Sequence, residues 1–203
     1  MIEDPTRVGS SLLIDPIVMS LIEAPSLIDV GCGDGKFGFL TRIYKVNMRF
    51  MIGCDIFLPS LVFCKQHKLY NEVVLCDAGF LPFKENSCAT VIMIEIIEHL
   101  EETKGKRMIN GAEKIAQKKI IVTTPNKARK RLGHGINPYQ AHISSWTVQD
   151  LRRLGFKVYG VGSRLAKVPS LPAGKINVFF AYTFLLFPRL AIWLIAWKKI
   201  RKC

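Results

Sequence analysis

Residues 28–38 read IDVGCGDGKFG, so that Gly31, Gly33 and Gly35 stand on alternate positions after an apolar run. Glycines at such a turn allow tight backbone angles and let a ligand lie directly against the main chain. The turn also precedes a helix, whose N-terminal amides favour a carboxylate or a phosphate. Asp29 stands two residues before the first glycine. We expect its carboxylate to repel a pyrophosphate and to attract an ammonium or sulfonium group.

Two further acids end apolar runs of the chain. Asp55 ends MIGCD and suits the two hydroxyls of a ribose, while Asp77 ends VVLCD and suits the amino group of an adenine. The dinucleotide fingerprint GxGxxG is not matched, because Lys36 occupies the place of its third glycine. An amino acid moiety, a ribose and an adenine together describe S-adenosylmethionine. The sequence therefore predicts this cofactor.

These acids are positioned by strands and helices that alternate along the chain. Short apolar segments predict strands at 26–30, 49–53, 72–76, 90–94, 119–123 and 157–161. Segments with apolar residues on one face, or with residues typical of helix ends, predict helices at 10–23, 35–44, 58–67, 104–117 and 147–154. The alternation predicts an α/β fold, a Rossmann-like doubly wound, mostly parallel sheet with helices on both faces. Such sheets bind ligands at the carboxyl ends of their strands, where all three acids would gather.

Five stretches of the chain resemble class I S-adenosylmethionine-dependent methyltransferases of the small-molecule type. They are LIDVGCGDGKFG, MIGCDI, VVLCDAGFLPF, VIMIEIIEHL and IIVTTPN, and NPYQAHISSW and DLRRLGFKV extend the likeness to about residue 165. The resemblance implies a methyltransferase. It places Asp29, Gly31, Cys32 and Gly33 at the methionine part, Asp55 and Ile56 at the ribose, Asp77 and Ala78 at the adenine, and Glu95 beside the cofactor.

Two histidines are candidates for catalytic proton transfer. His142 follows the fifth predicted strand, where such folds place loops that face the acceptor, although bonding within its own loop explains it equally well. His99 begins a helix near the cofactor, in either a structural or a chemical role. A base is needed only if the acceptor keeps its proton at neutral pH. The six cysteines form no CxxC pair and no Cys/His cluster of zinc spacing, so the sequence predicts no metal site.

Motifs that are missing narrow the class of acceptor. The D/N-P-P-Y turn of amino-group methylation is replaced by IEIIEHL, and no cysteine follows a proline, as cytosine C5 chemistry requires. The basic run KARKR at 127–131 is either a solvated loop or a contact for an anionic acceptor or RNA. No aromatic residue accompanies it, which disfavours nucleic acid. We expect a small-molecule or lipid-linked acceptor. The alternatives are a non-catalytic cofactor-binding or membrane-scaffold protein and, less favoured, an RNA methyltransferase.

The charge and the apolar residues are unevenly distributed. Residues 1–103 carry a net charge of −6 and residues 104–203 one of +19, which suggests that the second half meets an anionic partner. Residues 178–197 hold a single charge, Arg189, and KKIRKC follows them. This length could span a bilayer, but an arginine inside costs about 2.5–3.5 kcal/mol on insertion scales. We expect a hydrophobic helical appendix that attaches to an anionic membrane surface, with packing on the domain or a partner, or one spanning helix, as alternatives.

The chain divides accordingly into three parts. Residues 1–25 hold a lead-in helix, residues 26–165 the S-adenosylmethionine-binding methyltransferase domain, and residues 166–203 the hydrophobic, basic-ended C-terminal segment. The first residues, MIEDPTR, contain no apolar run and predict no secretory signal. We therefore expect a cytoplasmic protein, on the cytoplasmic face of a membrane through its C-terminal segment.

Overall fold

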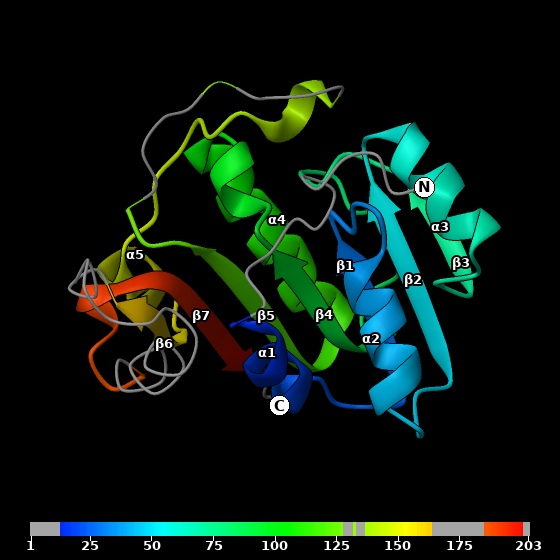
Figure 1. The fold of residues 1–203 in the computed structure, drawn as a ribbon, viewed down its shortest axis with the longest axis horizontal. Helices are drawn as coiled ribbons and strands as arrows, with labels where there is room; N and C mark the ends of the chain where they lie inside the picture. The colour runs from blue at the N-terminus through cyan, green and yellow to red at the C-terminus, as the bar shows by residue number, and fades with distance from the viewer. Residues whose placement is uncertain (1–12, 128–131, 133–136, 164–184, 201–203) are drawn as a thin grey trace, which may run out of the picture.

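The computed structural model describes residues 13–127, 132, 137–163 and 185–200 of the 203-residue chain. These residues form a seven-stranded sheet with helices on both faces (Figure 1). The strands are β1 (Ser26–Val30), β2 (Phe50–Asp55), β3 (Glu72–Leu75), β4 (Cys88–Ile94), β5 (Ala116–Pro125), β6 (Lys157–Ser163) and β7 (Ala191–Lys199). The α-helices are α1 (Asp15–Leu21), α2 (Lys36–Tyr44), α3 (Leu58–Gln66), α4 (Glu102–Ile115) and α5 (Val148–Arg153). Single 3₁₀ turns are η2 (Ile97–His99), η3 (Pro138–Gln140) and η4 (Pro188–Leu190).

The strand order is β3-β2-β1-β4-β5-β7-β6. Strands β1 to β5 run parallel, whereas β7 is antiparallel to both of its neighbours. The chain begins in the middle of the sheet, winds outward to β3, and returns to the other side of β1 with β4. This reversal leaves a crevice at the carboxyl ends of β1 and β4, where ligands of doubly wound sheets bind. The predicted doubly wound fold is confirmed.

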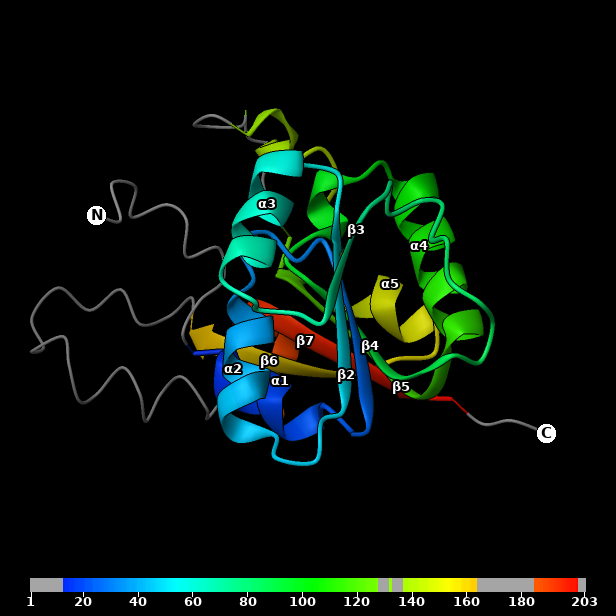
Figure 2. The same ribbon diagram turned by 90° about the vertical axis from the view of Figure 1, so that its right-hand side faces the viewer.

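Helices cover both faces of the sheet. In Figure 2 the sheet is seen edge-on, with α1, α2 and α3 on one side and α4 and α5 on the other. The apolar stripe predicted for α4 is buried against the sheet, together with Trp146 and Leu151. On the opposite face, Val18 of α1 and Phe37 of α2 pack on the strands. All residues of β4 are buried, as expected for a parallel strand covered on both faces.

Local signals in the sequence place the ends of several helices. Pro16 stands in the first turn of α1, where its missing amide hydrogen costs nothing. At the start of α5, the Thr147 hydroxyl accepts from the Asp150 amide at 3.2 Å, and the Asp150 carboxylate accepts from the Thr147 amide at 3.0 Å. Gly155 follows α5 with φ +84°. The predicted capping box and C-terminal glycine cap are therefore confirmed.

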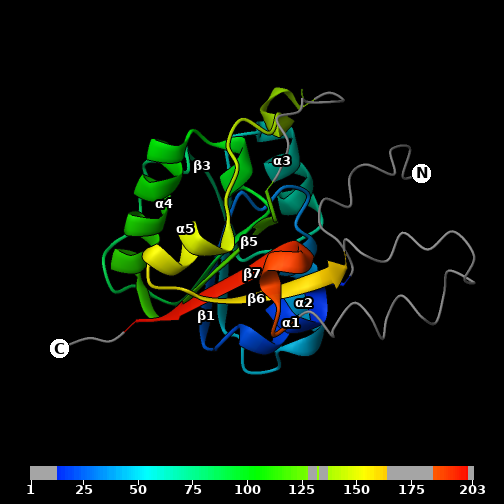
Figure 3. The ribbon, with the colours of Figure 1, turned by 90° about the vertical axis from the view of Figure 1, so that its left-hand side faces the viewer.

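The predicted helical C-terminal appendix is wrong for residues 191–199, which form β7. This strand lies between β5 and β6 (Figure 3). Leu194, Ile195 and Ala196 are fully buried. A strand covered on both faces is as uniformly apolar as a membrane segment, so hydropathy alone does not separate the two. Residues from the predicted domain 26–165 and from the predicted segment 166–203 thus build one sheet.

The prediction of membrane attachment is weakened, because part of the apolar segment that motivated it forms β7 of the sheet. Among the residues that the structure describes, no helix is long and apolar enough to cross a bilayer. Lys198, one of the basic residues that motivated the prediction, is 2.8 Å from the Glu113 carboxylate of α4. Residues 178–184 and 201–203 lie outside the described part of the chain. Contact between those residues and an anionic membrane surface stays a prediction.

Candidate cofactor pocket and acceptor site

The glycine turn between β1 and α2 forms one side of the site. Gly31, Gly33 and Gly35 have φ values of +71°, +50° and +82°, a conformation that side chains rarely adopt. A Cβ atom on Gly31 would lie 2.3 Å from the Ile96 side chain, whereas one on Gly33 would meet nothing within 4 Å. The backbone at Gly33 therefore faces open space, where a ligand can approach it.

Asp55, at the end of β2, is fixed by two backbone amides. One of its carboxylate oxygens accepts from the Gly33 amide at 2.9 Å and the other from the Phe57 amide at 2.8 Å. Each oxygen keeps a further lone pair for a ligand hydroxyl. The carboxylate is thus oriented before any ligand arrives, as a ribose-binding acid requires.

Asp77, just beyond β3, is held by a lysine that the sequence reasoning did not single out. Its carboxylate forms an ion pair with Lys104 of α4 at 2.7 Å and accepts from the Gly79 amide at 2.8 Å. Partial burial raises the pKa of this carboxyl, but the bonds from Lys104 and Gly79 outweigh it and hold the pKa below its usual value. Asp77 is therefore an ionised hydrogen-bond acceptor at neutral pH.

A pocket of about 750 Å³, open solvent included, lies over the carboxyl ends of these strands. Its wall includes the predicted cofactor-binding residues Gly31, Asp55, Ile56, Asp77, Ala78 and Glu95. It also includes residues that sequence reasoning missed, among them Ile96, Leu100, Lys104, Asn137, Tyr139 and Gln140. The last three stand in NPYQAHISSW, a stretch that carries the family likeness, and this was the available signal.

Asp29 and Cys32 lie beneath the glycine turn. Asp29 is 2% exposed, and its carboxylate accepts from the Tyr70 hydroxyl at 2.6 Å. That hydroxyl in turn accepts from the Gly38 amide of α2 at 3.1 Å. The Cys32 amide donates to the Cys54 carbonyl at 3.0 Å. These contacts support the turn from within the sheet, and direct contact of Asp29 and Cys32 with the methionine part stays a prediction.

The pH dependence of stability is expected to report on Asp29. Burial raises the pKa of this carboxyl from its ordinary value of 3.8 to about 7, against the hydrogen bond from Tyr70. Because the folded-state pKa is the higher one, the stability contributed by protonated Asp29 is complete below pH about 4 and is lost as the pH rises through about 7. Asp29→Asn removes this loss, so its free energy of unfolding relative to wild type should rise between pH 4 and 8, by on the order of 4 kcal/mol. Urea denaturation across this range measures the difference.

Tyr70→Phe provides the matched comparison. It deletes the hydroxyl that lowers the pKa of Asp29 while leaving the carboxyl in place, so the loss of stability should extend to higher pH and be larger in total than in wild type, with the same slope. Parallel stability curves for wild type and Asp29→Asn would contradict the assignment.

Two glutamates stand on the chain just beyond β4. Glu95 has φ +52°, and its carboxylate accepts from the Thr123 hydroxyl at 2.9 Å. Burial raises the pKa of Glu95 to about 7. Glu98 is buried and accepts from the Thr124 hydroxyl at 3.0 Å. Its own burial and then the neighbouring charge of Glu95 raise the pKa of Glu98 well above the usual value.

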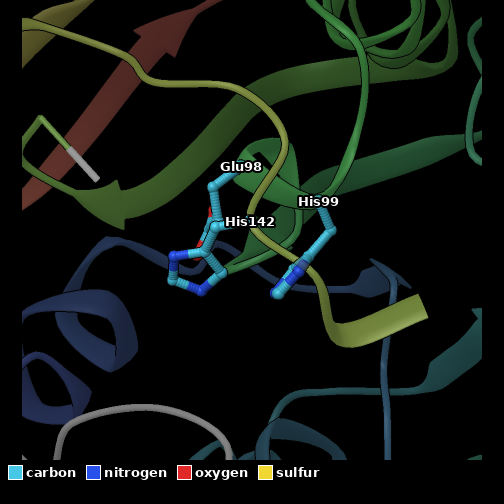
Figure 4. A group of neighbouring side chains, drawn as sticks. All are labelled: Glu98, His99 and His142. Atoms are coloured by element: carbon cyan, nitrogen blue, oxygen red, sulfur yellow. The ribbon is translucent and has the colours of Figure 1, made fainter. Parts of the chain in front are cut away.

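The structure brings the two predicted catalytic histidines together with Glu98 (Figure 4). The ring centroids of His99 and His142 are 4.9 Å apart, at an interplanar angle of 75°. The segment that carries His142 is bonded to η2, because the Glu98 carbonyl accepts from the amides of Ile143 and Ser144 at 2.9 and 3.1 Å. His99 also lines the cofactor pocket. Their catalytic roles stay predictions.

The pocket fits S-adenosylmethionine by the chemistry of its wall. An open glycine backbone, an oriented acid at the end of β2 and an ionised acid beyond β3 match its amino acid, ribose and adenine parts. With the doubly wound sheet, this site defines a class I S-adenosylmethionine-dependent methyltransferase. Residues 28–118 match a family model described as "Methyltransferase domain". The chain therefore carries a methyltransferase domain of this class, with S-adenosylmethionine as its cofactor.

Two known proteins are similar to parts of the chain. The protein MJ0638 of Methanocaldococcus jannaschii is 28% identical over 134 residues, which cover 65% of this chain and 55% of that protein. The tRNA (carboxymethyluridine(34)-5-O)-methyltransferase of Arabidopsis thaliana is 31% identical over 113 residues, 55% of this chain and 26% of that enzyme. The chain thus spans about half the length of the first of these relatives and a quarter of the second.

A solved structure shares the fold over nearly the whole chain. The S-adenosylmethionine-dependent methyltransferase of Archaeoglobus fulgidus superimposes with a TM-score of 0.62 at 17% identity, over 92% of this chain and 90% of that one. At this identity the likeness supports the fold alone.

Proposed function

We propose that the protein transfers a methyl group from S-adenosylmethionine to an oxygen atom of an RNA nucleotide. The observation that carries this proposal is the polar part of the pocket wall, where His99, Asn137, Tyr139 and Gln140 line the cofactor pocket. Such a wall suits an acceptor that forms hydrogen bonds. The likeness to an enzyme named for 5-O methylation of a tRNA nucleotide supports the RNA class.

Tyr139 revises the argument that disfavoured nucleic acid. The basic run 127–131 contains no aromatic residue, and residues 128–131 lie outside the described part of the chain. The structure nevertheless places Tyr139, which is 50% exposed, on the pocket wall. An exposed aromatic ring beside the site offers a stacking surface for an unpaired base. The strongly basic second half of the chain suits a phosphate backbone.

The chain contributes alignment and exclusion of water. When bound, S-adenosylmethionine supplies a methyl group already activated by the sulfonium charge. Asp55 and Asp77 fix the cofactor side of the pocket, and the polar wall holds the acceptor, an alignment worth up to roughly 7–11 kcal/mol in favourable cases. The acceptor oxygen bonds to the methyl carbon as the carbon–sulfur bond breaks. A hydroxyl acceptor also releases its proton, whereas a carboxylate acceptor has none to release.

Labelling of separated cell fractions tests the acceptor class. Purified protein is incubated with tritium-methyl S-adenosylmethionine and, separately, with RNA, a small-molecule extract and a lipid extract of the source cells. We expect label in the RNA fraction that ribonuclease converts to nucleotides. Mild alkali then releases methanol from a methyl ester but not from a methyl ether, which identifies the acceptor oxygen.

Two other outcomes would contradict the proposal. Label confined to the small-molecule or lipid fraction would restore the small-molecule or lipid-linked acceptor expected from the sequence. Absence of label in every fraction, with S-adenosylhomocysteine binding intact, would favour a non-catalytic cofactor-binding protein. An Asp55→Ala sample serves as the control for labelling that does not depend on the pocket.

A further inference from the structure

The side chains of Glu98, His99 and His142 form a cluster beside the cofactor pocket. One ligand atom from each residue lies within 4.8 Å of the others. Figure 4 shows that the first two come from η2 and the third from the segment after η3. We propose that this cluster is a binding site for a divalent transition-metal ion. No spacing motif covers it, because His99 and His142 are far apart in the sequence. For this reason the sequence reasoning predicted no metal.

Hydrogen bonds with neighbouring residues orient two of the three proposed metal ligands. Nδ1 of His99 is 3.0 Å from the Ala141 carbonyl oxygen. Since a carbonyl only accepts, Nδ1 carries the hydrogen, and Nε2 is the nitrogen of the neutral ring that can coordinate a metal. One carboxylate oxygen of Glu98 accepts from the Thr124 hydroxyl, which orients the other oxygen. Metal-binding histidines and carboxylates usually have such outer partners.

The burial of Glu98 also favours a cation. Its side chain is 1% exposed, and Glu95 stands three residues before it. A buried carboxylate is stable when it coordinates a metal, so a divalent ion at the cluster would match the burial of Glu98.

The ligand set indicates the class of metal. Two imidazoles and one carboxylate suit Zn²⁺, Mn²⁺, Fe²⁺ or Co²⁺, whereas Mg²⁺ and Ca²⁺ prefer oxygen ligands. Ligand atoms about 2.1 Å from one tetrahedral ion lie about 3.4 Å apart, so the side chains must close in from their present spread. Three protein ligands leave at least one position open. Since His99 lines the pocket, we place that open position toward the acceptor.

The role of the ion rests on the proposed methyl transfer, although its binding does not. Glu98, His99 and His142 would hold the ion, and a bound divalent ion would supply Lewis-acid activation of an acceptor hydroxyl, whose proton would pass to water. His99 and His142 then act as metal ligands rather than as the general bases expected from the sequence.

Direct titration of the full-length protein tests the site. Protein freed of metal with a chelator is titrated with Mn²⁺, followed by electron paramagnetic resonance, and with Zn²⁺, followed by calorimetry. We expect one ion per chain for at least one of the two metals. The variants Glu98→Gln and His142→Ala should each weaken its binding by at least about 100-fold, since each removes a ligand. His67→Ala is the matched control, because His67 is an exposed histidine just after α3, and its ring contacts the Phe63 carbonyl.

Binding of S-adenosylhomocysteine to each variant shows that its fold is intact. The inference is overturned if neither ion binds wild type at millimolar concentration, or if His142→Ala and Glu98→Gln bind as wild type does. Metal binding without methylation of RNA would leave the site standing and refute the proposed function. If the protein binds neither metal and still methylates RNA, the proposed function stands and the metal site is refuted.

Discussion

Replacement of Asp55 by alanine is expected to raise the dissociation constant of S-adenosylhomocysteine by about 100-fold or more. The carboxylate is oriented by the amides of Gly33 and Phe57, so its free lone pairs face the ribose position without further ordering. Two charge-assisted hydrogen bonds at about 1.5–3 kcal/mol each account for this change. The substitution also releases the Gly33 amide, which loosens the turn at the methionine part. Calorimetry at neutral pH measures the constant.

Two variants separate the ribose contact from support of the turn. Asp55→Asn keeps one acceptor and the shape of the side chain, so its effect should be smaller than that of alanine. Asp34→Asn, in the same turn, keeps the acceptor of the Ser60 hydroxyl at 2.7 Å and should change the affinity little. Unchanged affinity in Asp55→Ala would refute the ribose assignment.

The cofactor side of the site was predictable because its signals are local. Asp55, Asp77 and the glycine turn each follow directly on an apolar strand, and parallel strands bring their carboxyl ends to one edge. Nothing beyond the order of the strands is needed to assemble them. The sequence did not indicate the partner of Asp29, because its carboxylate accepts from the hydroxyl of Tyr70, 41 residues further on.

The acceptor side was less predictable because it depends on contacts between distant segments. His99 and His142 were predicted separately as catalytic candidates. Their proximity depends on backbone hydrogen bonds between η2 and residues 143–144, which no sequence pattern indicates. Tyr139 reaches the pocket through the same segment. Lys104 of α4 pairs with Asp77, which stands 27 residues before it in the chain. Side chains that meet through tertiary packing leave no periodic trace in the sequence.

The C-terminal residues show the limit of hydropathy as a guide. The long apolar run and the basic residues at its end predict a membrane-attached helix, and the single arginine within the run disfavours a spanning one. The structure instead places Arg189 in η4, at the start of β7, where the chain enters the sheet. The alternation of charge that would mark a half-exposed strand is missing, because β7 is covered on both faces.

Truncation after Lys175 is therefore expected to abolish folding. The division of the chain that the sequence suggested, with a separate segment at 166–203, would instead let the truncation release a soluble domain. Removing β7 leaves β5 and β6 with unpaired edges and exposes the surface that Leu194 and Ile195 cover. Each such side chain contributes about 1.5–3 kcal/mol when buried, and a domain has only about 5–15 kcal/mol in all. The truncated protein should be insoluble, or should show no cooperative thermal transition by circular dichroism. A chain that ends after Ile200 keeps all of β7 and should melt as wild type does. A soluble, cofactor-binding 1–175 fragment with the wild-type melting temperature would show that β7 is dispensable and would restore the separable segment.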